Sequence, residues 1–189
     1  MSTKSFILGV SLILALACTS CIVIEIKAPT RYSGFDQLTS PEKNRVMFIT
    51  DTVPYSYGAD SVVFAITATQ LKTYMNQFDS CLIYFWKPDC AAPNCKSPVA
   101  VQEYCQRNNI QFVLIGENYI AAKSMLVMSS ILEYPKFVIN TFHYDADLQR
   151  VYKRKFKQEL FGDSEYDKNP YAIYWIYRNA IFRKFFFEN

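Results

Sequence analysis

The stretch CLIYFWKPDCAAPNCKSP, residues 81–98, joins two regular elements through a loop that holds two cysteines. Its first six residues form a continuous apolar run, which is typical of a strand buried on both faces of a sheet. Ser97 and Pro98 suit the N-cap and first position of a helix. The stretch therefore predicts a buried strand, a loop around Cys90 and Cys95, and a helix.

Strands and helices also alternate on both sides of this stretch. The predicted elements are strands at 45–50, 61–66, 81–86, 110–116 and 136–140 and helices at 67–78, 99–109 and 120–132. Strands separated by helices of about a dozen residues indicate a sheet with parallel pairs that is covered by helices. The predicted fold class is α/β, with a central mixed sheet flanked by helices.

The C-terminal third has weaker patterns. Residues 148–156 fit a strand that pairs with 136–140 or the start of a charged helix, and the strand is the prediction. Residues 169–187 begin with Asn-Pro, which suits a helix start, and carry apolar residues at helical spacing. They predict an extended terminal helix packed on the sheet, although its many rings could instead face a partner or a membrane.

The N-terminus has the anatomy of an export signal. Lys4 precedes an apolar run at 6–17, and small residues and cysteines follow it. Residues 1–20 are therefore a predicted signal peptide. A membrane anchor is the alternative, because the apolar run can be extended through Ile24 to about 17 residues or more, the minimum that spans a bilayer.

The cysteines after this run resemble the lipobox of bacterial lipoproteins, in which a cysteine is diacylated and becomes the new N-terminus. Cys21 is the predicted lipidation site and Cys18 the alternative. The resemblance implies a protein of the bacterial cell envelope, anchored by lipid and facing the periplasm, whereas secretion after cleavage is the simpler reading. Residues 21–44 would then be a tether and residues 45–189 the folded domain.

Composition and motifs exclude several function classes. Hydrophobic residues make up 51% of the chain, which argues against a disordered protein. A net charge of +3 is too small to indicate nucleic acid as a partner. No Gly-rich phosphate loop, Ser-His-Asp set or pair of catalytic carboxylates stands out, so no cofactor is expected.

Once the chain is exported, its cysteines can form disulfides. Cys81, Cys90, Cys95 and Cys105 allow three fully paired connectivities, and their spacing does not choose among them. Cys81 and Cys105 fall in a predicted strand and a predicted helix, where free cysteines are commonly buried apolar thiols.

The order of elements resembles the thioredoxin superfamily. In that family the cysteine-bearing strand ends in Phe-Trp, and a later cis-proline opens a strand and lies against the cysteines. The matching residues are Phe85, Trp86, Cys90, Lys96, Tyr134 and Pro135. The resemblance implies a thioredoxin-like fold in which Cys90 and Cys95 are catalytic and Trp86, Tyr134 and Pro135 bind substrate.

The cysteine spacing departs from the family, because four residues separate Cys90 from Cys95 where the family has two. A helix starting at Cys90 would raise Cys95 by about 7.5 Å, beyond the roughly 7 Å limit for a disulfide. Either the loop carries a two-residue insertion, which we favour, or Pro93 replaces the second cysteine and the site has one thiol. Tyr84 also stands where the family often buries an acidic residue.

Three functions follow. An envelope thiol–disulfide oxidoreductase would act on protein or peptide thiols and disulfides, with Cys90 attacking and Cys95 resolving. A non-catalytic module would use a structural Cys90–Cys95 bridge and bind a peptide or protein partner. Metal binding by Cys90, Cys95 and His143 is disfavoured because the spacing is loose for zinc, so no metal site is predicted. In the first two cases the lipid anchor makes the membrane a further partner.

Overall fold

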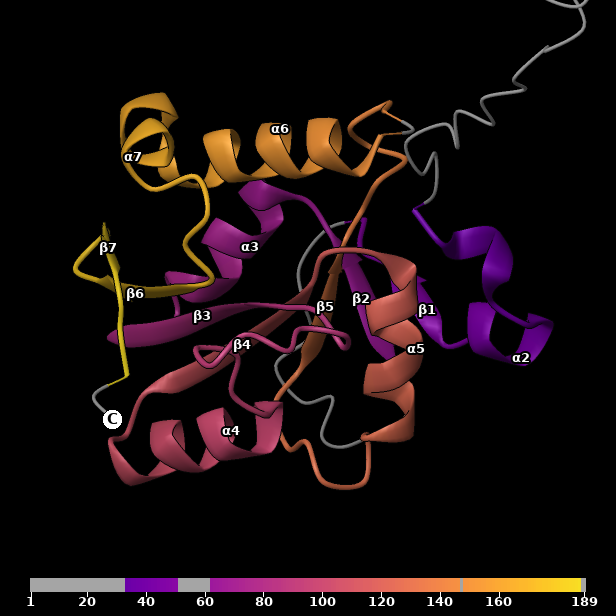
Figure 1. The fold of residues 1–189 in the computed structure, drawn as a ribbon, viewed down its shortest axis with the longest axis horizontal. Coiled ribbons are helices and arrows are strands. Elements are labelled where there is room, and N and C mark those ends of the chain that lie inside the picture. Colours follow the sequence, from indigo (N-terminus) through magenta and orange to yellow (C-terminus); the bar gives the residue numbers. More distant parts are fainter. Residues whose placement is uncertain (1–32, 51–61, 147, 188–189) are drawn as a thin grey trace, which may run out of the picture.

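The computed structural model describes residues 33–50, 62–146 and 148–187, which form one mixed sheet covered by helices (Figure 1). The strands are β1 (Val46–Phe48), β2 (Val63–Ile66), β3 (Ser80–Trp86), β4 (Gln111–Gly116), β5 (Lys136–Ile139), β6 (Tyr174–Arg178) and β7 (Ile181–Lys184). They make a seven-stranded sheet in the order β1-β2-β5-β4-β3-β6-β7. The predicted α/β class and mixed sheet are confirmed.

Strand direction divides the sheet into two parts. Five neighbouring strands are parallel to one another, in the order β1-β2-β5-β4-β3. The last two strands are antiparallel, β6 to β3 and β7 to β6. The carboxyl end of β3 therefore lies beside the amino end of β6, since Tyr84 is paired with Tyr174. The cysteine loop leaves the sheet at this junction.

Helices cover both faces of the sheet. They are η1 (Phe35–Gln37), α2 (Ser40–Lys43), α3 (Ala68–Met75), α4 (Pro98–Arg107), α5 (Tyr119–Val127), α6 (Gln149–Phe161) and α7 (Asp163–Lys168). Buried side chains of α3 and α6 pack on one face, and those of α4 and α5 pack on the other (Figure 1). All seven residues of β3 are buried, as expected for a strand between two helical layers.

Local sequence signals fix the starts of α3 and α4. Thr67 caps α3 and forms a capping box with Gln70. Ser97 caps α4 by accepting a hydrogen bond from the backbone N–H of Ala100, and Pro98 occupies the first helical position. The predicted strands and helices between residues 45 and 140 are all present, with ends shifted by a few residues.

The predicted terminal helix is wrong, because residues 174–184 form the hairpin β6–β7. Its two-residue turn places Asn179 and Ala180 at φ 52° and 59°, the left-handed conformation that tight hairpins require. Trp175 and Tyr177 enter the core on the α3 and α6 face, while Tyr174 enters it on the other. This alternation, in aromatic residues that favour strands, outweighs the helical spacing.

The strand predicted at residues 148–156 is also wrong, because this segment begins α6. Tyr152, Phe156 and Leu160 are fully buried at intervals of four residues, so the helical alternative describes the segment. The hairpin expected with residues 136–140 is not formed either, because β5 lies between β2 and β4 and is parallel to both.

Part of the predicted tether is packed on the domain. Phe35 lies edge-on to the ring of Tyr119 with centroids 4.9 Å apart, and Leu38 is buried. The backbone N–H of Tyr119 donates to the carbonyl of Ser33 at 2.7 Å. The packed residues therefore extend at least to Ser33, into the segment 21–44 that was predicted as a tether.

The predicted signal peptide and the lipidation candidates Cys18 and Cys21 lie outside the described residues. Across the ranges that the structure describes, no helix combines the length and apolar character needed to cross a bilayer.

Candidate functional site

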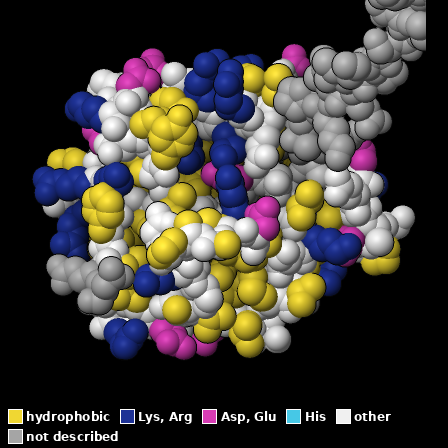
Figure 2. All heavy atoms as spheres, in the orientation of Figure 1, with side chains coloured by type: hydrophobic (Ala, Val, Ile, Leu, Met, Phe, Trp, Pro, Cys, Tyr) yellow, Lys and Arg dark blue, Asp and Glu magenta, His cyan; other side chains and the backbone are white. Residues whose placement is uncertain are grey.

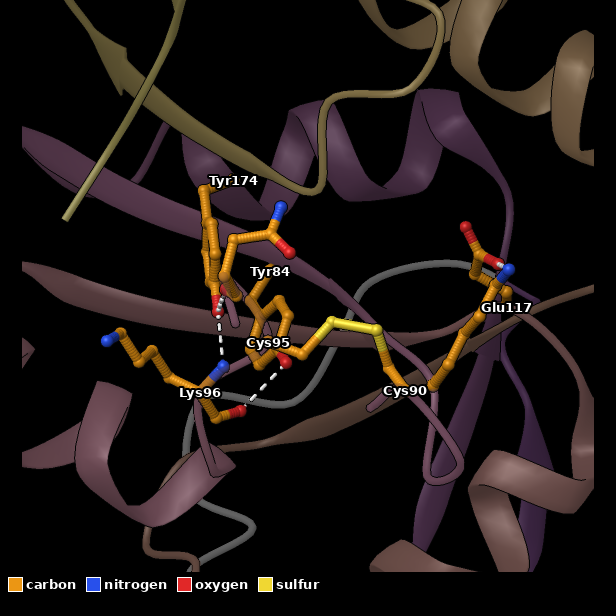
Figure 3. The surroundings of a disulfide bond; sticks show 8 residues. Tyr84, Cys90, Cys95, Lys96, Glu117 and Tyr174 are labelled. Atoms are coloured by element: carbon orange, nitrogen blue, oxygen red, sulfur yellow. Dashed lines mark hydrogen bonds and ion pairs between the residues drawn. A yellow bond between two sulfur atoms is a disulfide. The ribbon is translucent and has the colours of Figure 1, made fainter. Parts of the chain in front are cut away.

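Cys90 and Cys95 form a disulfide in the loop between β3 and α4, with their Cα atoms 6.1 Å apart (Figure 3). Both residues are partly exposed. The helix begins only at Pro98, so the loop is wide enough for the two sulfurs to meet. Cys90 and Cys95 are therefore paired, as the prediction of a wider loop required, and the site does not hold a single thiol.

Two tyrosines hold the chain on both sides of Cys95 (Figure 3). The Tyr84 hydroxyl donates to the carbonyl of Lys96 at 2.8 Å, and the Tyr174 hydroxyl accepts from the N–H of Lys96 and donates to the carbonyl of Asn94. Burial strongly raises the pKa of Tyr84. Tyr84 therefore serves as a neutral anchor of the loop and not as a substitute for an ionised acid.

Trp86, Tyr134 and Pro135 are not brought to the disulfide. Trp86 is 8% exposed and packs in the core on the α4 and α5 face. Tyr134 lines a separate cavity with Ser80 and Gln111, the first residues of β3 and β4. Because β5 is parallel to its neighbours, the residues that precede it lie toward the amino ends of the strands, away from a loop that follows β3.

Pro170 is the proline that lies at the cysteines, and sequence reasoning missed it. Together with Cys90 and Cys95 it lines a cavity of about 320 Å³. Pro170 precedes β6, whose antiparallel direction brings its start to the end of β3. No described peptide bond is cis, so the expected cis-proline at Pro135 is not found. The signal was the Asn-Pro pair, which we assigned to a helix start.

The cavity beside the disulfide is strongly basic. Its basic side chains are Lys87, Arg150, Lys153, Arg154 and Lys157, and its one acidic side chain is Glu117. Four of the five basic residues come from α6, and basic side chains gather over that helix in Figure 2. Sequence reasoning missed this cluster because it took residues 148–156 for a strand.

Glu117 is the buried centre of this cluster. It follows the end of β4, and its side chain is only 3% exposed. Lys153 donates a hydrogen bond to the Glu117 carboxylate, and the Nζ atoms of Lys87 and Lys157 lie 3.5 Å and 3.9 Å from it. One carboxylate thus balances three ammonium groups, and the cavity keeps an excess of positive charge.

Lys157 is the buried member of the cluster. Its Nζ lies 4.4 Å from the centre of the Phe85 ring and donates to the carbonyl of Ala172 at 3.4 Å. Burial lowers the pKa of the Lys157 ammonium to about 8, although the charge of Glu117 opposes this shift. Lys157 is therefore a buried ammonium group whose surroundings favour the neutral form.

Cys81 and Cys105 are free, buried thiols, as expected. Burial raises the pKa of each to about 12. A thiol reacts as its thiolate, so neither side chain is reactive in the folded protein. The disulfide therefore carries the redox chemistry available in the described part of the chain.

No protein-family model matches the chain, and no curated protein or solved structure is detectably similar to it. Within the described ranges no three His, Cys, Asp or Glu side chains are grouped so that they could hold a metal ion. His143 lies on an exposed turn after β5 and does not line the cavity of the cysteines.

Proposed function

We propose that this chain is an envelope thiol–disulfide oxidoreductase with Cys90 and Cys95 as its redox pair. The observation that carries the proposal is a partly exposed disulfide that opens onto a cavity lined by basic side chains. Neighbouring positive charges favour the thiolate, which is the form that attacks a disulfide. The exposure of the bridge lets a substrate sulfur approach it.

The arrangement around β3 supports a thioredoxin-like assignment. A cysteine loop follows β3, and Pro170 opens the neighbouring antiparallel strand and lines the same cavity as the cysteines. Pro170 thus has the position relative to the cysteines that the resemblance implies for Pro135, although the peptide bond before it is trans. The four-residue spacing remains a departure from the family pattern.

In the proposed reaction the reduced protein reduces a substrate disulfide. The Cys90 thiolate attacks one substrate sulfur, a Cys90–substrate bond forms, and the other substrate sulfur leaves and takes up a proton. The Cys95 thiol then loses its proton and attacks the Cys90 sulfur, which releases the second substrate thiol. Two electrons pass from the pair to the substrate, and the reverse sequence oxidises a substrate dithiol.

A redox titration tests this function. The full chain in neutral detergent is equilibrated in a glutathione series, alkylated, and mapped by mass spectrometry. We expect Cys90 and Cys95 to interconvert between dithiol and disulfide well above about −300 mV, and the variant Cys90→Ser to lose the transition. Buried Cys81 and Cys105 are the internal control, because they should stay unalkylated until the chain is denatured. A bridge that resists reduction below that potential would exclude a dithiol catalyst.

A binding module with a structural disulfide is the second candidate. Tyr84 and Tyr174 fix the backbone after Cys95, which suits a rigid recognition loop. A second cavity of about 460 Å³ lies on the other side of that loop, lined by Pro93 and by the C-terminal segment 184–187. This module becomes the better proposal if the redox titration shows a bridge that does not cycle.

We also propose that the chain is a lipoprotein acylated at Cys21, and this rests on the sequence alone. In a bacterial host fed an alkyne-labelled fatty acid, the wild-type chain and Cys18→Ser should be labelled, whereas Cys21→Ser should not. Two acyl chains, with about 0.8 kcal/mol for each buried methylene, hold a protein stably on a membrane. Loss of label in Cys18→Ser alone would move the anchor to Cys18.

A further inference from the structure

Basic residues are concentrated at the disulfide far beyond their share in the chain. The chain has 20 Lys and Arg against 17 Asp and Glu, which is close to balanced. The cavity of Cys90 and Cys95 nevertheless combines its five basic side chains with Glu117 as the one acid. The positive charge at this cavity is therefore denser than the near-balanced composition of the chain would give by chance.

Two of these residues are free to bind an anion from outside. Arg150 and Arg154 are exposed, lie one helical turn apart on α6, and make no ion pair with any acidic side chain among the described residues. Like charges at this spacing destabilise a helix slightly. A guanidinium pair of this kind is suited to carboxylates, which it binds through parallel N–H bonds.

The second cavity beside the disulfide loop offers aromatic surface. It is lined by Pro93, Ile173 and the three phenylalanines 185–187, together with Lys96, Lys168 and Lys184, and none of the described acidic side chains lines it. Pro170, Tyr171 and Ile173 line both cavities, so the two depressions adjoin at the segment that precedes β6. Tyr171 is 93% exposed there and offers an open ring. A chain that fills both cavities has to cross the segment 170–173, and one of the two cavities is lined by Cys90 and Cys95.

We propose that the substrate of the disulfide is an acidic peptide segment, whose carboxylates bind Arg150 and Arg154 and whose apolar side chain enters the phenylalanine-lined cavity. This inference rests on the proposed oxidoreductase function and names its substrate class. An extended segment that occupies both cavities would carry its cysteine between the two anchors, where the Cys90–Cys95 bridge is partly exposed.

The test measures binding without redox chemistry. The probes are ten-residue fluorescein-labelled peptides that carry one Phe, three Glu and a serine in place of the substrate cysteine. In the matched control peptides the three Glu are replaced by three Gln. Each peptide is made with its sequence in both directions. Fluorescence anisotropy with the oxidised full chain in neutral detergent should show about tenfold tighter binding of one Glu peptide than of its Gln partner. The preference should shrink when salt rises from 50 to 200 mM, because salt screens exposed charges.

Variants locate the contact. Arg150→Gln together with Arg154→Gln should remove the preference for Glu, whereas the control Arg107→Gln, an exposed arginine on α4, should leave it unchanged. Equal binding of Glu and Gln peptides, or displacement of both by millimolar inorganic phosphate, would overturn the inference in favour of a site for small free anions. Since the peptides lack cysteine, this result is independent of the redox titration, and either proposal can fail alone.

Discussion

Replacement of Glu117 by Gln is expected to lower the free energy of unfolding by about 3–5 kcal/mol, the usual cost of removing one partner from a buried ion pair. The Glu117 side chain is 3% exposed, and three lysines converge on its carboxylate. The amide keeps the shape and one acceptor but removes the negative charge. Lys157, itself 5% exposed, then stays buried without a counter-charge. Urea unfolding of the oxidised protein at pH 7 measures the loss.

Two further variants show whether the charge is the cause. Glu165→Gln removes a carboxylate from an exposed pair with Lys168, and its effect should stay below about 1 kcal/mol. Glu117→Gln combined with Lys157→Met should recover much of the stability, because the buried charge that lost its partner is gone as well. If Glu117→Gln costs no more than Glu165→Gln, the three lysines reach solvent and the cluster is not a buried ion network.

The parts of the fold that could be predicted are those encoded within a few residues. The capping box of Thr67 and the Ser97-Pro98 start of α4 are local signals, and the structure has them as expected. The run 81–86 is apolar at every position because β3 lies between two helical layers. Such patterns do not depend on what the rest of the chain does.

The misjudged segments depend on contacts with distant residues. Residues 174–177 carry rings at both helical and alternating spacing, and pairing with β3 selects the strand. The proline of the site was misplaced for the same reason, since only the direction of β6 brings Pro170 to the cysteines. Pairing between strands about 90 residues apart in the chain cannot be recognised from the few residues of one segment.

Part of the basic cluster could have been predicted from the sequence. Lys87 and Glu117 directly follow two predicted buried strands, and the carboxyl ends of adjacent parallel strands meet at one edge of a sheet. Their ion pair at 3.5 Å could therefore have been anticipated. The positions of Lys153 and Lys157 could not be anticipated, because these two residues lie on the same side of the chain only when residues 149–161 form a helix.

Lys157→Met is expected to change how stability depends on pH. Burial lowers the pKa of this ammonium from 10.5 to about 8, which corresponds to about 3 kcal/mol against the charged form. Between pH 8 and 10.5 the unfolded chain holds a proton on Lys157 that the folded chain has released. The contribution of Lys157 to the free energy of unfolding therefore rises with pH there, by up to about 1.4 kcal/mol per pH unit.

The variant lacks this dependence. Its free energy of unfolding should therefore exceed that of the wild type most at pH 7, and this difference should be smaller by about 2 kcal/mol at pH 9.5. Urea unfolding of both oxidised proteins across this range gives the difference directly, because titrations common to both chains cancel. Lys155→Met, at an exposed position of the same helix, is the control for the substitution itself. A difference for Lys157→Met that stays constant with pH would mean that water reaches Lys157 in the folded protein and that its charge does not vary over this pH range.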